Sequence, residues 1–341
     1  MQPRPDGKTC SVPLIRQRGA AMGEMTKAVH EDAWPSLPLA AWRDTRDTLH
    51  LWAQMIGKIR LGLCPMVNHW WNVPLYVNGR GLTTSTIPYE DRSLEIHFDF
   101  LQHELVIETC DGDRRTVALE PRTVKSFYEE LMGKLHDIGI DVHIRTMPVE
   151  IPNAIPFDQD ELHKSYDADY AHRFWLTLVS VDRVLQQFRG GFVGKASPVH
   201  FFWGSFDLVA TRFSGRRAPP HGAVPNTPLS VVQEAYSHEQ ESCGFWTGGG
   251  GYDDAAFFSY IYPEPEGYAK AKVPAPGFFS ETMREFLLPY ENVRTSPDPA
   301  GMILSFAQAT YDAAADLAHW NRTALERSAR PMPHEYRTAG P

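Results

Sequence analysis

The order of predicted elements repeats once along the chain, and this repeat constrains the fold more than any other feature. A long amphipathic helix is expected over 38–63, followed by an aromatic segment with proline and histidine at its start, then by strands and a helix over 122–138. The same order begins again with a helix over 170–188 and an aromatic strand over 200–213, and a last long helix is expected over 299–327. The repeat predicts two similar halves and an internal duplication.

Strand-like segments between these helices predict antiparallel sheets. Leu94, Ile96 and Phe98 alternate with polar residues, which is the two-residue period of a half-buried strand. Asp111-Gly112 is a hairpin signal before the next strand. Because the apolar face of a sheet must be covered by another layer, we expect helices on one side of each sheet. The predicted fold class is therefore α+β, with two similar halves, each an antiparallel meander flanked by helices.

A local sequence match supports the predicted duplication. Residues 65–77 (PMVNHWWNVPLYV) are aligned with residues 197–209 (SPVHFFWGSFDLV), and His69 is placed over His200. The alternative is that two α+β halves share an element order by chance. The expected organisation is a loose extension over 1–33, a first half over 34–145, a Pro-rich acidic connector over 146–167, a second half over 168–328 and a flexible tail over 329–341.

Composition excludes several classes of protein. The formal net charge of the 341-residue chain is −9, so the chain has no basic excess with which to neutralise nucleic-acid phosphates. No apolar run approaches the ~20 residues that a membrane helix needs. The cysteines are far apart, which indicates free thiols in a reducing cytosol, and residues 1–25 lack the apolar core of a signal peptide. We therefore expect a cytoplasmic protein that binds neither nucleic acid nor membrane.

Four long strings in the second half resemble a known bacterial family. They are HFFWGSFDLVATRFSGRRAP (200–219), EAYSHE (234–239), CGFW with the glycines that follow it (243–251) and FFSYIYPEPEG (257–267). These strings are similar to the domain of unknown function 5996 family, and the resemblance covers about Trp34 to Arg327. One departure is TGGGG, where the family is expected to have a proline after the tryptophan. The family has no established activity, so the resemblance leaves the function open.

The segment that begins at His200 combines aromatic residues with charge. A continuous strand would place Trp203 and Asp207 on one face, away from Phe202 and Phe206 on the other. A buried Asp207 is costly unless it is paired, and Arg212 or Arg216 is the expected partner. Such a carboxylate and guanidinium would bind an anionic or amide-bearing ligand in an aromatic pocket. The alternative is a structural ion pair that braces the end of a strand.

The EAYSHE segment supplies candidate catalytic residues. It follows a predicted helix and precedes an aromatic strand, so it is expected at the end of a sheet, where sites often form. Tyr236, His238 and Glu239 would provide acid–base chemistry, with His238 as the general base because its ordinary pKa lies near neutrality. Glu239 would orient His238 only if the backbone turns between them. The alternative is a solvent-exposed loop histidine.

Aromatic residues of the second half predict a ring-lined pocket. Tyr260 and Tyr262 share one face of a strand, and we expect them to line the pocket together with Trp203 and Trp246. We also assign His200, at the start of the aromatic strand, to the binding residues. The alternative is plain aromatic packing without a cavity.

Three segments carry features of metal or phosphate sites without a complete motif. The connector run 158–163 holds three carboxylates and an imidazole, and His97, Asp99 and His103 gather near one strand end. The glycine run 248–251 precedes a strand instead of the helix N-terminus that a phosphate loop needs. No metal is predicted, and the cofactor is left open.

The leading hypothesis is a small-molecule enzyme that uses acid–base chemistry in an aromatic-lined cleft of the second half. The alternative is a non-catalytic module that binds a metabolite or another protein. A third class, a structural partner protein, predicts an exposed aromatic patch instead of an enclosed pocket. The sequence leaves open whether the chain is an enzyme and how many copies assemble.

Overall fold

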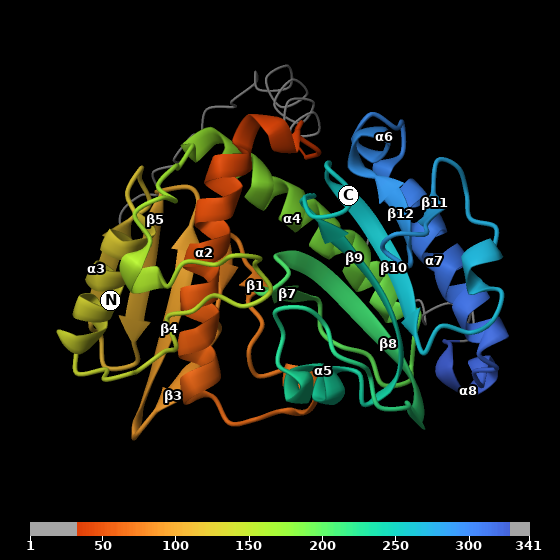
Figure 1. The fold of residues 1–341 in the computed structure, drawn as a ribbon, viewed down its shortest axis with the longest axis horizontal. Helices are drawn as coiled ribbons and strands as arrows, with labels where there is room; N and C mark the ends of the chain where they lie inside the picture. The colour runs from red at the N-terminus through yellow and green to blue at the C-terminus, as the bar shows by residue number, and fades with distance from the viewer. Residues whose placement is uncertain (1–32, 328–341) are drawn as a thin grey trace, which may run out of the picture.

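The computed structural model describes residues 33–327, and within them it contains two antiparallel sheets of six strands each, with helices around them (Figure 1). The predicted α+β class with two similar halves is therefore confirmed. The predicted extension, apart from Ala33, and the predicted tail lie outside the described residues. No helix in this described part of the chain has the length and apolar character needed to cross a membrane.

The first half consists of a long helix, a meander and a second helix. Its strands are paired in the order β1-β2-β4-β5-β6, with β3 beside β4. Leu94 and Ile96 of β4 are buried, as their alternation predicts, and Thr123 caps the second helix by accepting a hydrogen bond from the Ser126 amide. The elements are α2 (Leu39–Leu63), β1 (Tyr76–Val77), β2 (Gly81–Thr83), β3 (Ile87–Tyr89), β4 (Arg92–Asp99), β5 (Glu104–Thr109), β6 (Arg114–Ala118) and α3 (Val124–His136).

The second half repeats this plan with more helices. Its strands are paired in the order β11-β12-β10-β9-β8-β7. Asp167 caps its first helix by accepting from the Tyr170 amide, and Pro299 lies in the first turn of its long C-terminal helix. The elements are α4 (Ala168–Gly190), β7 (His200–Phe202), β8 (Asp207–Arg217), α5 (Leu229–Ala235), β9 (His238–Trp246), β10 (Ala256–Tyr262), β11 (Phe278–Ser280), β12 (Glu285–Pro289), α6 (Tyr290–Arg294), α7 (Pro299–Leu317) and α8 (Arg322–Leu325).

The two sheets meet at their first strands. Leu75, beside β1, and Phe201 of β7 form an antiparallel bridge in which each amide donates to the other's carbonyl at 2.9 Å. The alignment of His69 with His200 is wrong, because His69 lies in a 3-10 helix (Asn68–Trp70) and His200 lies in β7. A two-fold relation between the halves would pair their first strands in this antiparallel way. The duplication itself stays a prediction.

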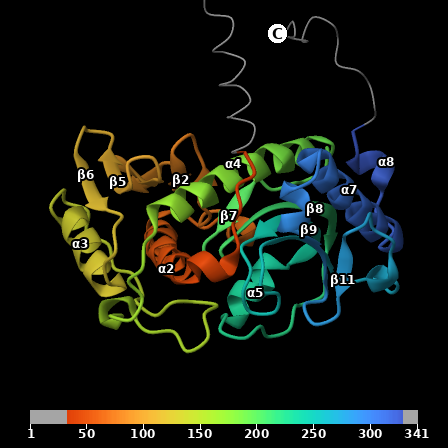
Figure 2. The ribbon, with the colours of Figure 1, turned by 90° about the horizontal axis from the view of Figure 1, so that it is seen from above.

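The second sheet has two different faces. Leu208 and Ala210 of β8 belong to the main core, on the side that α4 and α7 cover, whereas α5 lies on the other side (Figure 2). On that other side a second, smaller apolar cluster is formed by Val209, Ala256, Phe258 and Leu287. This second face lacks the full helical cover of the first, and the candidate site lies on it.

The aromatic segment is a hairpin and not one strand. β7 ends at Phe202 and β8 begins at Asp207, and these two residues are cross-strand partners on the same face. The prediction of a continuous alternation is therefore wrong. The turn directs Trp203 into the core, where its indole donates to the Val73 carbonyl at 3.0 Å. A Cβ atom added at Gly57 would lie 2.0 Å from Trp203 Nε1, so α2 needs a glycine at this contact.

Candidate functional site

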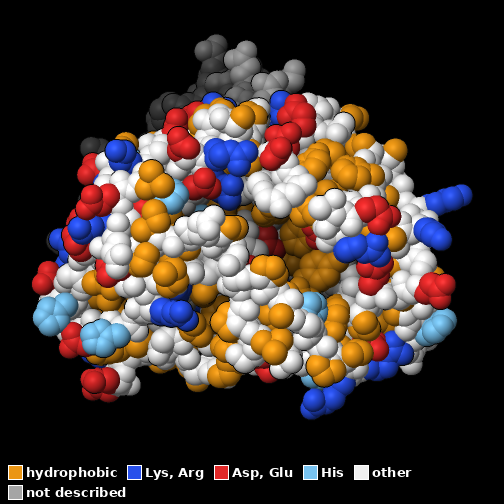
Figure 3. Space-filling model, in the orientation of Figure 1, with side chains coloured by type: hydrophobic (Ala, Val, Ile, Leu, Met, Phe, Trp, Pro, Cys, Tyr) orange, Lys and Arg blue, Asp and Glu red, His pale blue; other side chains and the backbone are white. Residues whose placement is uncertain are grey.

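A hollow opens on the second face of the second sheet, over strands β8 to β10, and acidic and hydrophobic side chains are visible inside it (Figure 3). Its floor is the smaller apolar cluster of that face. Trp246 and Tyr260 pack against this cluster and keep part of their surface open to solvent. Of the rings predicted to line a pocket, these two lie at the hollow, whereas Trp203 is buried in the core at 6% exposure.

Asp207 is a buried carboxyl group without the predicted arginine partner. It is 9% exposed, and the Ser205 hydroxyl donates a hydrogen bond to it. Burial, reinforced by the nearby charge of Glu150, raises the pKa of Asp207 to about 7. Near neutral pH this group therefore exists in both the protonated and the ionised form.

Two further carboxyl groups act on Asp207 through space. Glu285, at the start of β12, is half-buried, and burial together with the charge of Asp207 raises its pKa to about 8. Glu150 comes from the connector and lies against Gly204, where an added Cβ atom would be 2.1 Å from its Oε1. Burial also raises the pKa of Glu150, although its side chain is reached by solvent, as expected for a group on the wall of a hollow. We call Glu150, Asp207 and Glu285 the carboxyl trio.

Two tyrosine hydroxyls lie beside the carboxyl trio. The hydroxyls of Tyr236 and Tyr260 are 3.1 Å apart. Burial raises the pKa of both, and the charge of Asp207 adds to the effect, so both stay protonated near neutral pH. The Tyr236 ring also packs against His221 at 4.6 Å and against Tyr262 at 5.3 Å between centroids. The structure thus brings together three of the tyrosines that the sequence singled out.

The three predicted catalytic residues do not converge. Tyr236 faces the tyrosine group, whereas the His238 ring lies 5.4 Å from the His69 ring. Glu239 is the next residue of β9, so its side chain takes the opposite face, where it accepts hydrogen bonds at 2.8 Å from Ser214 and from Arg216. The expectation that Glu239 orients His238 is therefore wrong.

The predicted pairing of Asp207 with an arginine is also wrong. Arg212 is five positions further along β8 and so lies on the opposite face of the sheet. There it is 3% exposed, stacks over the Phe188 ring at 3.5 Å and is the cross-strand partner of buried Glu241. Arg216 is engaged in a 2.6 Å salt bridge with Glu239.

His200 lies on the same face as the hollow, as the cross-strand partner of Val209 in its floor. It is 1% exposed, and neither ring nitrogen has a hydrogen-bond partner within the described part of the chain. Its ring contacts Trp71 and Tyr76, with centroids 5.7 and 5.6 Å away. Burial, aided by the charge of Arg60, lowers the pKa of His200 to about 3, so the imidazole is neutral.

Glu150 and Glu285 are site residues that the sequence reasoning missed. Glu150 belongs to a connector that was interpreted as a linker, and its apposition to Gly204 is a long-range contact. Glu285 is the first residue of the short apolar run EFLLP. A charged residue at the start of a buried strand is the one sequence signal that could have indicated its role in the site. Among residues 33–327, no three His, Cys, Asp or Glu side chains are grouped so that they could hold a metal ion.

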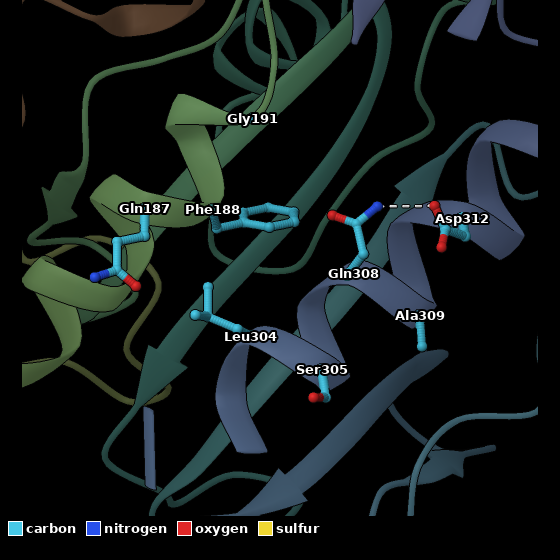
Figure 4. A pocket seen from close by; sticks show the side chains of 8 residues that line it. All are labelled: Gln187, Phe188, Gly191, Leu304, Ser305, Gln308, Ala309 and Asp312. Atoms are coloured by element: carbon cyan, nitrogen blue, oxygen red, sulfur yellow. Dashed lines mark hydrogen bonds between the residues drawn. The ribbon is translucent and has the colours of Figure 1, made fainter. Parts of the chain in front are cut away.

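A separate groove lies between α4 and α7, on the other side of the second sheet (Figure 4). It encloses about 510 Å³ and is lined by Gln187, Phe188, Gly191, Leu304, Ser305, Gln308, Ala309 and Asp312. Its one acid, Asp312, already accepts hydrogen bonds from Gln308 at 2.8 Å and from Arg322 at 2.6 Å. This groove therefore offers less for acid–base chemistry than the hollow does.

Comparison with known proteins adds one finding. The model of a family of unknown function, DUF5996, matches residues 34–327. No curated protein and no solved structure matches the chain. The match covers most of the chain and bears out the resemblance seen in the sequence, but it brings no activity with it.

Proposed function

The chain belongs to the DUF5996 family, whose function is unknown, and we propose from its geometry that it is an enzyme that acts on a small molecule by acid–base chemistry in the hollow. One observation carries the proposal. Asp207 and Glu285 lie on the face of the sheet that carries the smaller apolar cluster, and their pKa values are raised to about 7 and about 8. Groups whose pKa lies near the working pH transfer protons most effectively.

The two carboxyl groups have different chemical roles because their environments differ. Asp207 ionises first and acts as the general base, while Glu285 keeps its proton to a higher pH and acts as the general acid. Because the two charges interact, the pair holds a single proton over the pH range between its two pKa values. The Tyr236 and Tyr260 hydroxyls would hold an oxygen or nitrogen atom of the substrate.

The charge of the hollow favours a neutral or cationic substrate. The anionic ligand expected from the sequence required an arginine beside Asp207, and both candidate arginines are engaged elsewhere. Three carboxyl groups repel an anion, whereas aromatic faces such as those of Trp246 and Tyr260 attract a cation or stack on a polar ring. A cytoplasmic location for this reaction is part of the proposal.

The second candidate function is a module that binds a metabolite without turning it over. The apolar floor and the neutral His200 imidazole, which has no hydrogen-bond partner among residues 33–327, favour binding as much as catalysis. The two candidates differ in one result, because an enzyme consumes its ligand and a module returns it unchanged.

The test is incubation of the purified protein with a metabolite extract, followed by mass spectrometry of all small molecules. The enzyme proposal predicts compounds that are consumed by the native protein and by a control variant, Asp91→Asn, at an exposed turn of the first half. Asp207→Asn and Glu285→Gln should abolish the consumption. Retention of a compound without consumption would favour the binding module. Consumption that both hollow variants preserve would overturn the assignment of the site.

A further inference from the structure

Lys195 lies outside the hollow's carboxyl trio and makes an unusual contact. It sits in the loop between α4 and β7, its side chain is exposed, and its carbonyl accepts from the Phe213 amide at 3.0 Å. Its Nζ atom donates to His69 Nε2 at 2.7 Å. The same Nζ lies 5.0 Å from the Trp71 ring centroid and 4.7 Å from that of Phe213. An amine is thus held on two aromatic faces against a neutral imidazole instead of a carboxylate.

The His69 ring is held in one tautomer. Its Nδ1 donates to the Ala235 carbonyl at 3.1 Å, which leaves Nε2 as the acceptor that faces Lys195. Its backbone amide donates to Glu234 Oε1 at 2.9 Å. His69 and Trp70 have φ values of 58° and 60°, so two consecutive non-glycine residues lie in the left-handed region. Backbone strain of this kind is concentrated at functional sites.

The surroundings of Lys195 favour its neutral form more than those of Lys125 do. Burial lowers the pKa of Lys195, against the smaller opposing effect of Glu234. Burial also lowers the pKa of His69 and of the neighbouring His238, and the positive charge of Lys195 adds to both effects. By contrast, Glu161 raises the pKa of exposed Lys125 through a 3.1 Å salt bridge.

We propose that Lys195 is a nucleophilic amine that forms a Schiff base with an aldehyde or ketone, and that His69 is its base. A nucleophile in hydrogen-bond contact with a base that a third group orients is the arrangement of covalent catalysis. His69 Nε2 takes a proton from Nζ, and the nitrogen lone pair attacks the carbonyl carbon. The carbonyl electrons move to oxygen, which takes a second proton from the nitrogen. His69 then returns its proton to this hydroxyl, and water leaves as the protonated C=N bond forms. The Trp71 ring, which keeps part of its surface open to solvent, suits an aromatic or otherwise apolar carbonyl compound.

The proposal is tested by trapping the Schiff base on the intact protein. The full chain is incubated with pyridoxal near neutral pH, reduced with sodium borohydride, digested and analysed by mass spectrometry at each lysine. Lys195 should be labelled at least about tenfold faster than Lys125, which is less than the ~10²–10⁴-fold that a positioned base contributes in enzymes. The labelling rate should also begin to rise at a lower pH for Lys195 than for Lys125.

His69→Gln serves as the matched variant, because the amide preserves a polar contact but cannot take the proton. It should reduce labelling of Lys195 several-fold and leave labelling of Lys125 unchanged, and Lys195→Arg should remove the labelled peptide. If His69→Gln fails to fold, the comparison of the two lysines in the native protein still decides the question. Equal rates and equal pH profiles at Lys195 and Lys125 would overturn the proposal. The result is independent of the hollow, because no residue of the carboxyl trio takes part.

Discussion

Replacement of Asp207 by Asn should stabilise the protein at neutral and alkaline pH. The pKa of Asp207 is about 7 in the folded chain, against an ordinary value of 3.8. As pH rises between these two values, the unfolded chain loses the proton while the folded chain retains it. The unfolded state is thereby favoured, so the native protein loses stability across this window, and the loss stays constant above it. Asn carries no charge and avoids the loss.

The structure sets the size of this effect. Asp207 is only 9% exposed, so solvent screens its charge weakly. A rise of the pKa from 3.8 to about 7 corresponds to at most about 4 kcal/mol, at roughly 1.4 kcal/mol for each pH unit. The predicted gain in the free energy of unfolding for Asp207→Asn is therefore up to about 4 kcal/mol at pH values above about 7, and close to zero at or below pH ~4.

Urea unfolding of the native protein and the variant, measured at several pH values, checks this prediction. The difference between the two proteins removes the contribution of titrating groups that do not interact with Asp207, whereas the lowered pKa of Glu285 in the variant adds to the gain in stability. Asp91→Asn, at an exposed turn, is the control and should show no pH-dependent difference. A difference for Asp207→Asn that is independent of pH, or a loss of stability at alkaline pH, would show that the pKa of Asp207 is not raised in the folded protein.

Three further substitutions test the packing described above. Arg212→Met should lower the free energy of unfolding in urea by about 1–3 kcal/mol, because it removes the guanidinium that stacks over Phe188 and whose charge favours the ionised form of buried Glu241; adding Glu241→Gln should recover part of this loss, and no coupling between the two would contradict this interaction. Gly57→Ala should lower the free energy of unfolding by about 1–3 kcal/mol, because the new Cβ would lie 2.0 Å from the Trp203 indole. Thermal unfolding measures this loss, and an unchanged melting temperature would argue against that contact. Arg216→Ala should change stability by less than about 1 kcal/mol, because its salt bridge is half-exposed; a larger change would show that the pair is structural.

Local periodicity explains why much of the fold could be predicted. Alternation at Leu94 and Ile96 marked a half-buried strand, and Asp111-Gly112 marked the hairpin between β5 and β6, because both signals depend on residues close in sequence. The break in the aromatic segment was missed because Trp203 and Phe206 continue the apolar pattern through the turn. The positive φ of 60° at Phe206 is set by the tertiary structure and carries no clear sequence signal.

The site was harder to predict because it depends on contacts between distant elements. The opposite orientations of Asp207 and Arg212 follow from their odd spacing on one strand, so this part of the error was avoidable. The apposition of Glu150 to Gly204 depends on the path of the connector, which no local pattern encodes. Acidic connectors are usually solvated, and only the three-dimensional structure distinguishes this carboxyl group from its neighbours.

The most direct measurement of the central claim is an NMR titration of the side-chain carboxyl carbons in the full-length protein, with signals assigned through Asp207→Asn and Glu285→Gln. We expect midpoints near 7 for Asp207 and near 8 for Glu285, each shifted when the other residue is replaced. Midpoints near the ordinary values of about 4 for both residues would contradict it, since two fully ionised carboxylates at neutral pH would leave no proton to transfer.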